Sequence, residues 1–267
     1  MDYKTVIYKA NPLILASFSL TLNQQRLILA CIAQVQDPRE PIDRDHEFTV
    51  TAQSFSRLFN VDQNSVYSDL KIATKSLLSQ YISINYDPDS PTASGVDSSW
   101  VSWAKYYDKE GKVVIKFSEK VLPYLSNLKE GCFSRYQIHQ VAPMKSVYAI
   151  RLYEILVSES WRTSLFELAI EDLRRMFRLD KEYTRIFDLK TFVIDPSVRS
   201  INEHTDLTVT YTQRKTGRSV SHLVFAIRRI KPEVVVKRVV VDDEYIRKHA
   251  RVGESWDQAR RRLRGDK

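Results

Sequence analysis

Apolar residues recur along this chain at helical spacing in some stretches and in strict alternation in others. In the first half these patterns predict, in chain order, a helix over 20–36, a short strand over 46–51, a helix carrying Phe55, Leu58 and Phe59, a helix carrying Val66, Leu70, Ala73 and Leu77, and strands over 81–86, 100–107 and 112–117. Asp37-Pro38 ends the first helix, because the residue before a proline avoids the helical region. Residues 108–111 close the last two strands into a hairpin, and 87–99 are expected to form a loop.

The second half repeats this order. It predicts a helix from about Lys145, a strand over 165–168, a helix over 170–177, a helical region over about 185–204, and strands over 207–212 and 220–227. In the helix over 170–177 the apolar residues face inward, and three arginines are expected to point outward: Arg174, Arg175 and Arg178. Asp195-Pro196 predicts either a kink or the start of a second helical segment. Gly217 supplies a positive φ at the hairpin tip over 213–218.

Helix, strand, helix, turn, helix and β-hairpin is the order of a winged helix, and it occurs twice. The sequence therefore predicts an α+β fold with two tandem winged-helix domains and a basic C-terminal tail. We expect an N-terminal winged helix over 1–130, a C-terminal winged helix over 131–230 and the tail over 231–267. The two copies share a pattern of elements and little residue identity.

Charge separates the two halves. The 267 residues include 41 Lys and Arg against 33 Asp and Glu, a formal net charge of +8. The first 130 residues hold 14 basic and 15 acidic side chains, whereas the remainder holds 27 and 18. Since the whole excess lies in the second half, that half is expected to bind a polyanion such as nucleic acid. A mildly basic protein without such a partner is the plainer alternative.

Several classes of chemistry lack their usual residues. No two of the six glycines are five apart, which excludes a phosphate-binding P-loop. The five histidines are scattered and only Cys31 and Cys132 are present, so we expect no metal site, no cofactor and no catalytic residues. The missing histidine pair also disfavours a metal-dependent nicking enzyme. With no apolar run of ~18 residues and few cysteines, we expect no membrane segment and a cytoplasmic location.

Three groups of side chains are candidates for DNA binding. The region over 185–204 is expected to turn Leu189, Val193 and Ile201 inward and to expose four polar residues: Arg185, Lys190, Thr191 and Arg199. The hairpin tip carries three cations that suit phosphates: Arg214, Lys215 and Arg218. The first half carries a stripe on its third helix: Tyr67, Lys71 and Lys75. Each group also fits an ordinary solvated surface, and because the first half is nearly neutral, we expect weaker, mainly phosphate contacts there.

Three stretches resemble a known family. They are Leu20 to Leu29 (LTLNQQRLIL), Tyr148 to Glu154 (YAIRLYE), and a spaced set from Tyr183 through Asn202 and Lys215 to Phe225. In this order and spacing, over about residues 12–230, they resemble the plasmid replication initiator proteins of theta-replicating bacterial plasmids, the Rep_3 / RepB superfamily.

The resemblance implies two winged helices that bind direct repeats, called iterons, in double-stranded DNA at a plasmid origin. It implies a monomer that initiates replication and a homodimer, formed through the first domain, that represses its own gene. It further implies contacts with the host initiator DnaA and the replicative helicase, no catalytic activity, and base-reading roles for Lys190 and Thr191. A winged-helix transcriptional repressor, a nicking replication enzyme and a scaffold that uses the wings for protein contacts remain alternatives.

Overall fold

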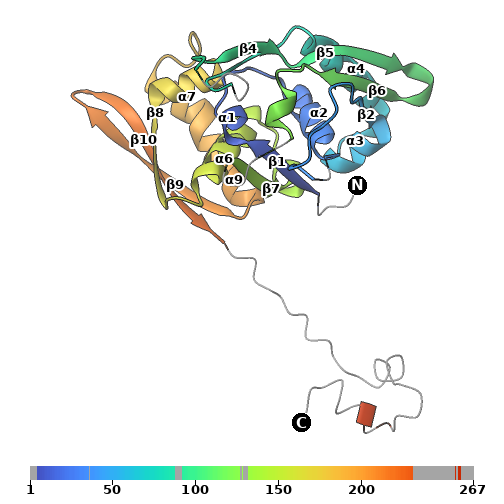
Figure 1. Cartoon of the computed structure of the whole chain (residues 1–267). Helices are drawn as coiled ribbons and strands as arrows, with labels where there is room; N and C mark the ends of the chain where they lie inside the picture. Colours follow the sequence, from blue (N-terminus) through green and yellow to red (C-terminus); the bar gives the residue numbers. More distant parts are fainter. Residues whose placement is uncertain are drawn as a thin grey trace. The chain divides into compact units, whose positions relative to one another are not determined.

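The computed structural model describes residues 5–35, 37–87, 92–126, 128, 132–230, 256, 258 and 259 (Figure 1). Residues 1–230 form one compact unit. The expected tail over 231–267 lies almost wholly outside the described residues. No helix among the described residues is long and apolar enough to cross a membrane.

The first winged helix has the expected order of elements. Its members are α2 (Leu22–Ile32), β2 (Phe48–Thr51), α3 (Ala52–Phe59), α4 (Gln63–Leu77), β5 (Val101–Tyr107) and β6 (Lys112–Phe117). The strands pair in the order β2-β6-β5. Thr21 starts α2 by accepting a hydrogen bond from the backbone N–H of Gln24, whose side chain bonds back to Thr21. The helix is shorter than the expected 20–36, and after its end the Gln34 side chain donates to the carbonyl of Ala30.

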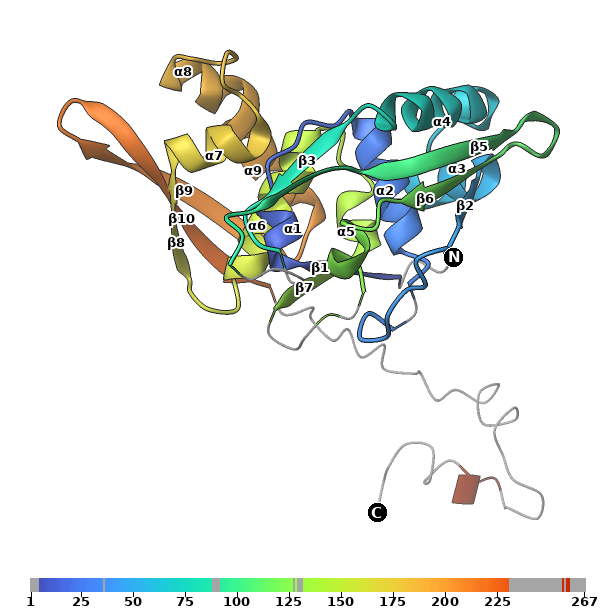
Figure 2. The ribbon, with the colours of Figure 1, turned by 45° about the horizontal axis from the view of Figure 1, so that its top comes forward.

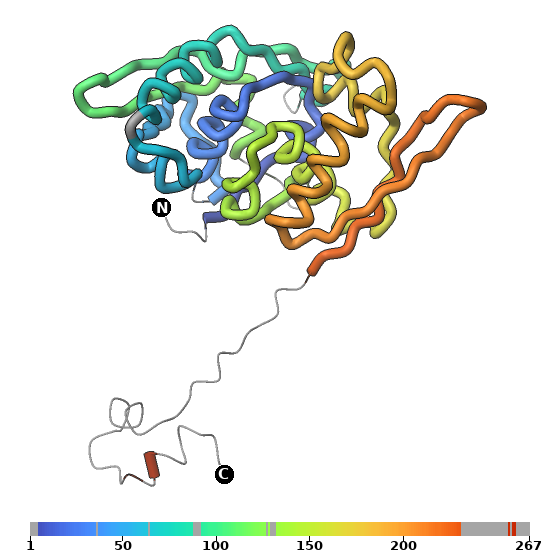
Figure 3. The backbone as a smooth tube through the Cα atoms, turned by 180° about the vertical axis from the view of Figure 1, so that it is seen from behind, coloured from blue at the N-terminus to red at the C-terminus, as the bar shows by residue number. Residues whose placement is uncertain are grey.

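The second winged helix repeats that order. Its members are α6 (Val147–Glu159), β8 (Leu165–Ala169), α7 (Ile170–Phe177), α8 (Ile186–Leu189), a π-helical turn η3 (Lys190–Ile194), α9 (Asp195–His204), β9 (Leu207–Thr216) and β10 (Ser219–Arg229). Its strands pair in the order β8-β10-β9, which matches the first sheet. The two β-hairpins, β5–β6 and β9–β10, project from opposite ends of the 1–230 unit (Figure 3). The predicted α+β fold with two tandem winged helices is confirmed.

Two local expectations were wrong. Part of the expected loop over 87–99 is a strand, β4 (Val96–Ser99), which pairs with β3 (Tyr81–Ile84) and matches Val96 to Ile84. The expected hairpin tip over 213–218 is narrower, since the strands continue to Thr216 and Ser219 and leave only Gly217 and Arg218 to turn. In both places polar side chains concealed the strand, because backbone pairing does not require apolar residues on an exposed ribbon. Gly217 has the expected positive φ, +62°.

Pro196 changes the helix that precedes it. The chain stays helical through Asp195-Pro196, but η3 widens the turn so that the N–H of Asp195 bonds to the carbonyl of Lys190, five residues back. Proline has no N–H to donate, and its ring crowds the carbonyl four residues earlier. Pro196 is therefore accommodated in the first turn of α9, and α8 and α9 are joined by a single wide turn.

Elements outside the winged helices join the two halves. Strand β1 (Val6–Ala10) pairs antiparallel with β7 (Phe133–Gln137), and short helices α1 (Asn11–Ile14) and α5 (Ile138–Val141) follow these strands. Lys9 of β1 is fully buried and lies 2.9 Å from both carboxylate oxygens of Glu154 on α6. Burial lowers the pKa of Lys9, and the carboxylate of Glu154 opposes that shift. The N-terminal strand is thus fixed to the second winged helix by a buried ion pair.

Candidate nucleic-acid interface

The helix from α8 to α9 has the orientation that the sequence predicts. Leu189, Val193 and Ile201 are buried, while Arg185 and Thr191 are exposed. Arg199 is exposed too, and Lys190 is half-buried beside the apolar face. Figure 2 shows α8 and α4, the third helices of the two winged helices, on the same side of the molecule. In a winged helix this element enters the major groove.

Arg174 does not point freely outward, which corrects the expectation for that residue. Its guanidinium donates to four backbone carbonyls in the turn between α7 and α8: Leu179 at 3.2 Å, Glu182 at 2.9 Å, Thr184 at 3.2 Å, and Tyr183. Carbonyls in a turn lack strand or helix partners, and one planar donor with five N–H groups can satisfy several of them. Arg174 therefore fixes the turn that leads into α8. Arg175 and Arg178 are exposed, as expected.

The cations around this helix fall into two groups. Arg185 is paired with Asp188 by two hydrogen bonds, of 2.6 and 2.8 Å, and these bonds raise the pKa of Arg185. Lys190 and Arg199 form no ion pair with the residues that the structure describes. Asp195 accepts a hydrogen bond from the Tyr211 hydroxyl and so connects α9 to the wing. Burial and this bond raise the pKa of Tyr211.

The cations of the second wing, β9–β10, also divide into paired and unpaired ones. Arg214 is paired with Glu167 of β8, and its Nη2 lies 2.7 Å from Nδ1 of His222. Lys215 and Arg218 at the tip are exposed and form no ion pair within the described part of the chain. The charge that is available to a ligand is therefore concentrated at the tip.

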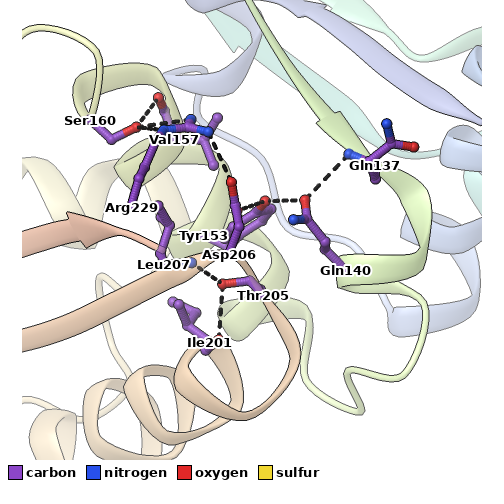
Figure 4. Close-up of polar contacts among 10 residues, drawn as sticks. All are labelled: Gln137, Gln140, Tyr153, Val157, Ser160, Ile201, Thr205, Asp206, Leu207 and Arg229. Carbon is purple, nitrogen blue, oxygen red and sulfur yellow. Dashed lines mark hydrogen bonds and ion pairs between the residues drawn. The ribbon is translucent and has the colours of Figure 1, made fainter. Parts of the chain in front are cut away.

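The base of the wing is anchored by a polar network (Figure 4). Asp206, just before β9, accepts from Arg229 Nη1 at 2.9 Å and lies 3.1 Å from the Tyr153 hydroxyl of α6. The other side of the Arg229 guanidinium donates to Ser160 Oγ at 3.0 and 3.1 Å. Both strands of the wing are therefore held to α6 at one end, while the other end projects.

In the first winged helix the expected stripe is partly engaged by its own wing. Tyr67 and Lys71 both donate to Asp108 Oδ1, at 2.6 and 2.7 Å. These two bonds lower the pKa of Asp108, and burial together with the bond raises the pKa of Tyr67 to about 12. Lys75 is exposed. Only part of the stripe is thus free for a ligand.

The sequence patterns missed two features of the interface. One is the role of Arg174, which looks like any charged residue on an amphipathic helix. The other is the exposure of Phe187 and Phe192 on α8 and η3, where aromatic residues ordinarily suggest a core. Among the described residues there is also no group of three or more His, Cys, Asp or Glu side chains that could hold a metal ion.

A helix-turn-helix with a two-stranded wing, present twice and bearing free cations on its third helices and wing tip, defines a DNA-binding protein of the tandem winged-helix class. The sequence pattern of the WH1 domain of the Initiator Replication proteins matches residues 6–157, and the WH2 domain of the Initiator Rep proteins matches 169–227. The chain belongs to this family of replication initiators, as the resemblance of its motifs predicted.

Individual relatives agree with this assignment. The chain is 26% identical to a replication initiation protein of Escherichia coli, over 83% of this chain and 69% of that protein. It is 24% identical to the PI protein of Escherichia coli, over 84% of this chain and 83% of the relative. The fold matches the crystal structure of the Pi initiator protein in complex with iteron DNA with a TM-score of 0.71 at 22% identity, covering 84% of this chain and 97% of that one.

Proposed function

We propose that this initiator binds iterons, the direct repeats of its plasmid origin, through both winged helices on one DNA duplex. The observation that carries the proposal is the duplicated winged helix, whose two third helices lie on one side of the molecule (Figure 2). Cations that form no ion pair with the described residues lie on the third helix and the wing of the second winged helix. The similarity in fold to the Pi protein, which was crystallised with iteron DNA, supports it.

The proposed contacts divide into base reading and phosphate binding. The first turns of the recognition helix in the second winged helix carry Arg185, Lys190 and Thr191. These side chains would meet base edges or the adjacent phosphates. The remaining candidates would hold the backbone: Arg199, Arg214, Lys215, Arg218, Tyr67, Lys71 and Lys75. Because Tyr67 and Lys71 share Asp108, and Arg214 is paired with Glu167, these three should contribute less than Lys215 and Arg218.

The division of roles follows the charge. The N-terminal domain, 1–130, would supply the dimer interface and secondary DNA contacts. The C-terminal domain, 131–230, would supply the main DNA contacts, and the basic tail, 231–267, a supplementary one. The protein would start replication as a monomer, repress its own gene as a homodimer, and engage the host DnaA and replicative helicase. Its action in the bacterial cytoplasm would be binding without catalysis or cofactor.

The proposal is tested with the DNA that flanks the gene. Purified full-length chain is titrated against that DNA and against a shuffled duplex of equal length at fixed salt, since affinities at different salt are not comparable. Tight binding confined to repeated segments, together with plasmid maintenance that depends on them, is the expected result. Binding at a promoter with no effect on maintenance would indicate a transcriptional repressor instead, and metal-dependent strand cleavage would indicate a nicking enzyme.

A further inference from the structure

Two phenylalanines are exposed at the start of the third helix of the second winged helix, its recognition helix. Phe187 on α8 is 68% exposed and Phe192 on η3 is 58% exposed. Exposure of a phenyl ring to water is unfavourable, and two such rings on the recognition helix are available for contact with a ligand. Neither ring belongs to the hydrophobic core, to which this helix contributes Leu189, Val193, Ile194 and Ile201.

The surroundings hold the ring of Phe192 in place. Its centroid lies 6.0 Å from that of Tyr183, which lies 6.5 Å from Tyr148, and Tyr148 stacks on the buried Phe177 at 5.8 Å. Arg174 donates to the backbone carbonyl of Tyr183 and so fixes the turn that carries this aromatic row. The ring of Phe192 is thus the exposed end of a row of packed aromatic side chains. Its position is preorganised for contact with a ligand.

The charges on the same turns are few. Arg185 is paired with Asp188, Lys190 is unpaired but half-buried, and Thr191 is the exposed residue between the two rings. Besides the Arg185–Asp188 pair and Lys190, this part of the helix presents outward Thr191 and the two phenyl rings. In the major groove the apolar feature of a base edge is the C5-methyl group of thymine, which apolar side chains contact.

We propose that Phe187 and Phe192 determine sequence preference by packing against thymine methyl groups in the major groove. The proposal rests on the proposed iteron binding and extends it by naming two residues that select the sequence. Cations at Lys215 and Arg218 hold the backbone, and the two rings favour thymine at their positions in the repeat.

Deoxyuridine tests this inference directly, because it pairs like thymidine and lacks only the methyl group. The binding site is first enriched from a random duplex library with the full-length chain. Each dT of the enriched site is then replaced by dU in turn, and the dissociation constant is measured by fluorescence anisotropy. Wild-type protein should lose affinity at one or two positions by about fourfold, equivalent to about 0.8 kcal/mol at 1.4 kcal/mol per tenfold.

The variants assign each methyl group to a ring. Phe187→Ala and Phe192→Ala should bind the dT site more weakly, and each should abolish the dT-to-dU difference at one position. Leu165→Ala, which changes a 63% exposed apolar residue on β8, is the matched control and should keep both differences. All three sites are exposed, so the variants should fold, which thermal unfolding checks.

Two results would overturn the inference in distinguishable ways. If the wild type binds dU and dT sites equally, or if the phenylalanine variants retain the full difference, the inference is wrong while iteron binding stands. If the full-length chain enriches no sequence at all, the proposed iteron binding and this inference are both rejected.

Discussion

Arg26 and Arg151 occupy equivalent places in the two winged helices, and each holds the chain segment that leads into the other winged helix. Both are buried in the first helix of their domain, five residues after the N-cap. Each lies over the ring of the phenylalanine that ends the second helix of the same domain. Their Cζ atoms lie 5.3 Å from the Phe59 ring and 5.2 Å from the Phe177 ring, respectively.

The hydrogen bonds of the two arginines cross between the halves. Arg26 donates to the carbonyls of Ala142 and Met144, just before α6, at 3.2 and 3.1 Å. Arg151 donates to those of Ala16 and Phe18, just before α2, at 2.7 and 2.9 Å. Arg151 also donates to the carbonyl of Ile14 at 3.5 Å and, within its own half, to that of Met176 at 3.0 Å. The pair accounts for the arginine in each of the motifs LTLNQQRLIL and YAIRLYE, and it makes the two winged helices depend on each other.

Replacing Arg151 with methionine should lower the free energy of unfolding by ~3 kcal/mol or more, because four buried carbonyls, those of Ile14, Ala16, Phe18 and Met176, each lose a hydrogen-bond donor. Arg26→Met should cost less, since Arg26 donates to two carbonyls. Urea unfolding at constant slope measures both changes. Arg162→Met, at an exposed arginine 3.9 Å from Glu159, is the control and should stay within about 0.5 kcal/mol. If Arg151→Met is as stable as the wild type, the hydrogen bonds of Arg151 do not hold the two winged helices together.

Asp108 should make the first wing sensitive to acid. Bonds from Lys71 and Tyr67 lower its pKa in the fold, so its stabilising contribution is present above the ordinary carboxyl value of about 4 and is lost as the pH falls through the lowered value. Wild type should therefore exceed Asp108→Asn in stability at pH 6, and the difference should shrink toward pH 3. A difference that is constant over this range would show that the ionised carboxylate stabilises nothing.

Lys190→Ala should weaken binding to the cognate repeat by ~1–3 kcal/mol if the lysine reads a base, and it should relax the preference at one position. Competition between the cognate repeat and its single-base variants, followed by gel shift, measures both effects. Unchanged affinity and unchanged preference would remove Lys190 from the base-reading set.

Lys215→Ala should weaken binding to all sequences alike and lower the slope of log affinity against log salt by about one, because one phosphate contact is lost. Arg214→Ala is the matched comparison. Since Arg214 is paired with Glu167, Arg214→Ala should change the slope of log affinity against log salt less than Lys215→Ala does. A loss confined to one sequence would assign Lys215 to base reading.

Local sequence patterns were sufficient to predict most of the fold. Helical spacing and alternation located both winged helices because one face of each element is buried, and the positive φ at Gly217 followed from its residue type. The pairing of β1 with β7 left no such trace, because Val6 and Gln137 meet only through tertiary structure. The same holds for Arg26, Arg151 and Arg174, whose partners are backbone carbonyls without a side-chain signature.

The charge distribution predicted where unpaired cations lie in the second half but not which of its arginines are paired. The basic excess of the second half is where the free cations Lys190, Arg199, Lys215 and Arg218 lie. Composition could not show that Arg185 and Arg214 are paired with Asp188 and Glu167, since such pairs depend on side-chain geometry.

A hydroxyl-radical footprint of the full-length monomer on a single repeat tests the central claim most directly. Two winged helices on one duplex should protect two tracts of backbone about one helical turn, ~10 base pairs, apart, with the stronger protection under the C-terminal domain. Protection confined to a single turn would mean that one winged helix alone engages the DNA, and the account of a shared duplex would be wrong.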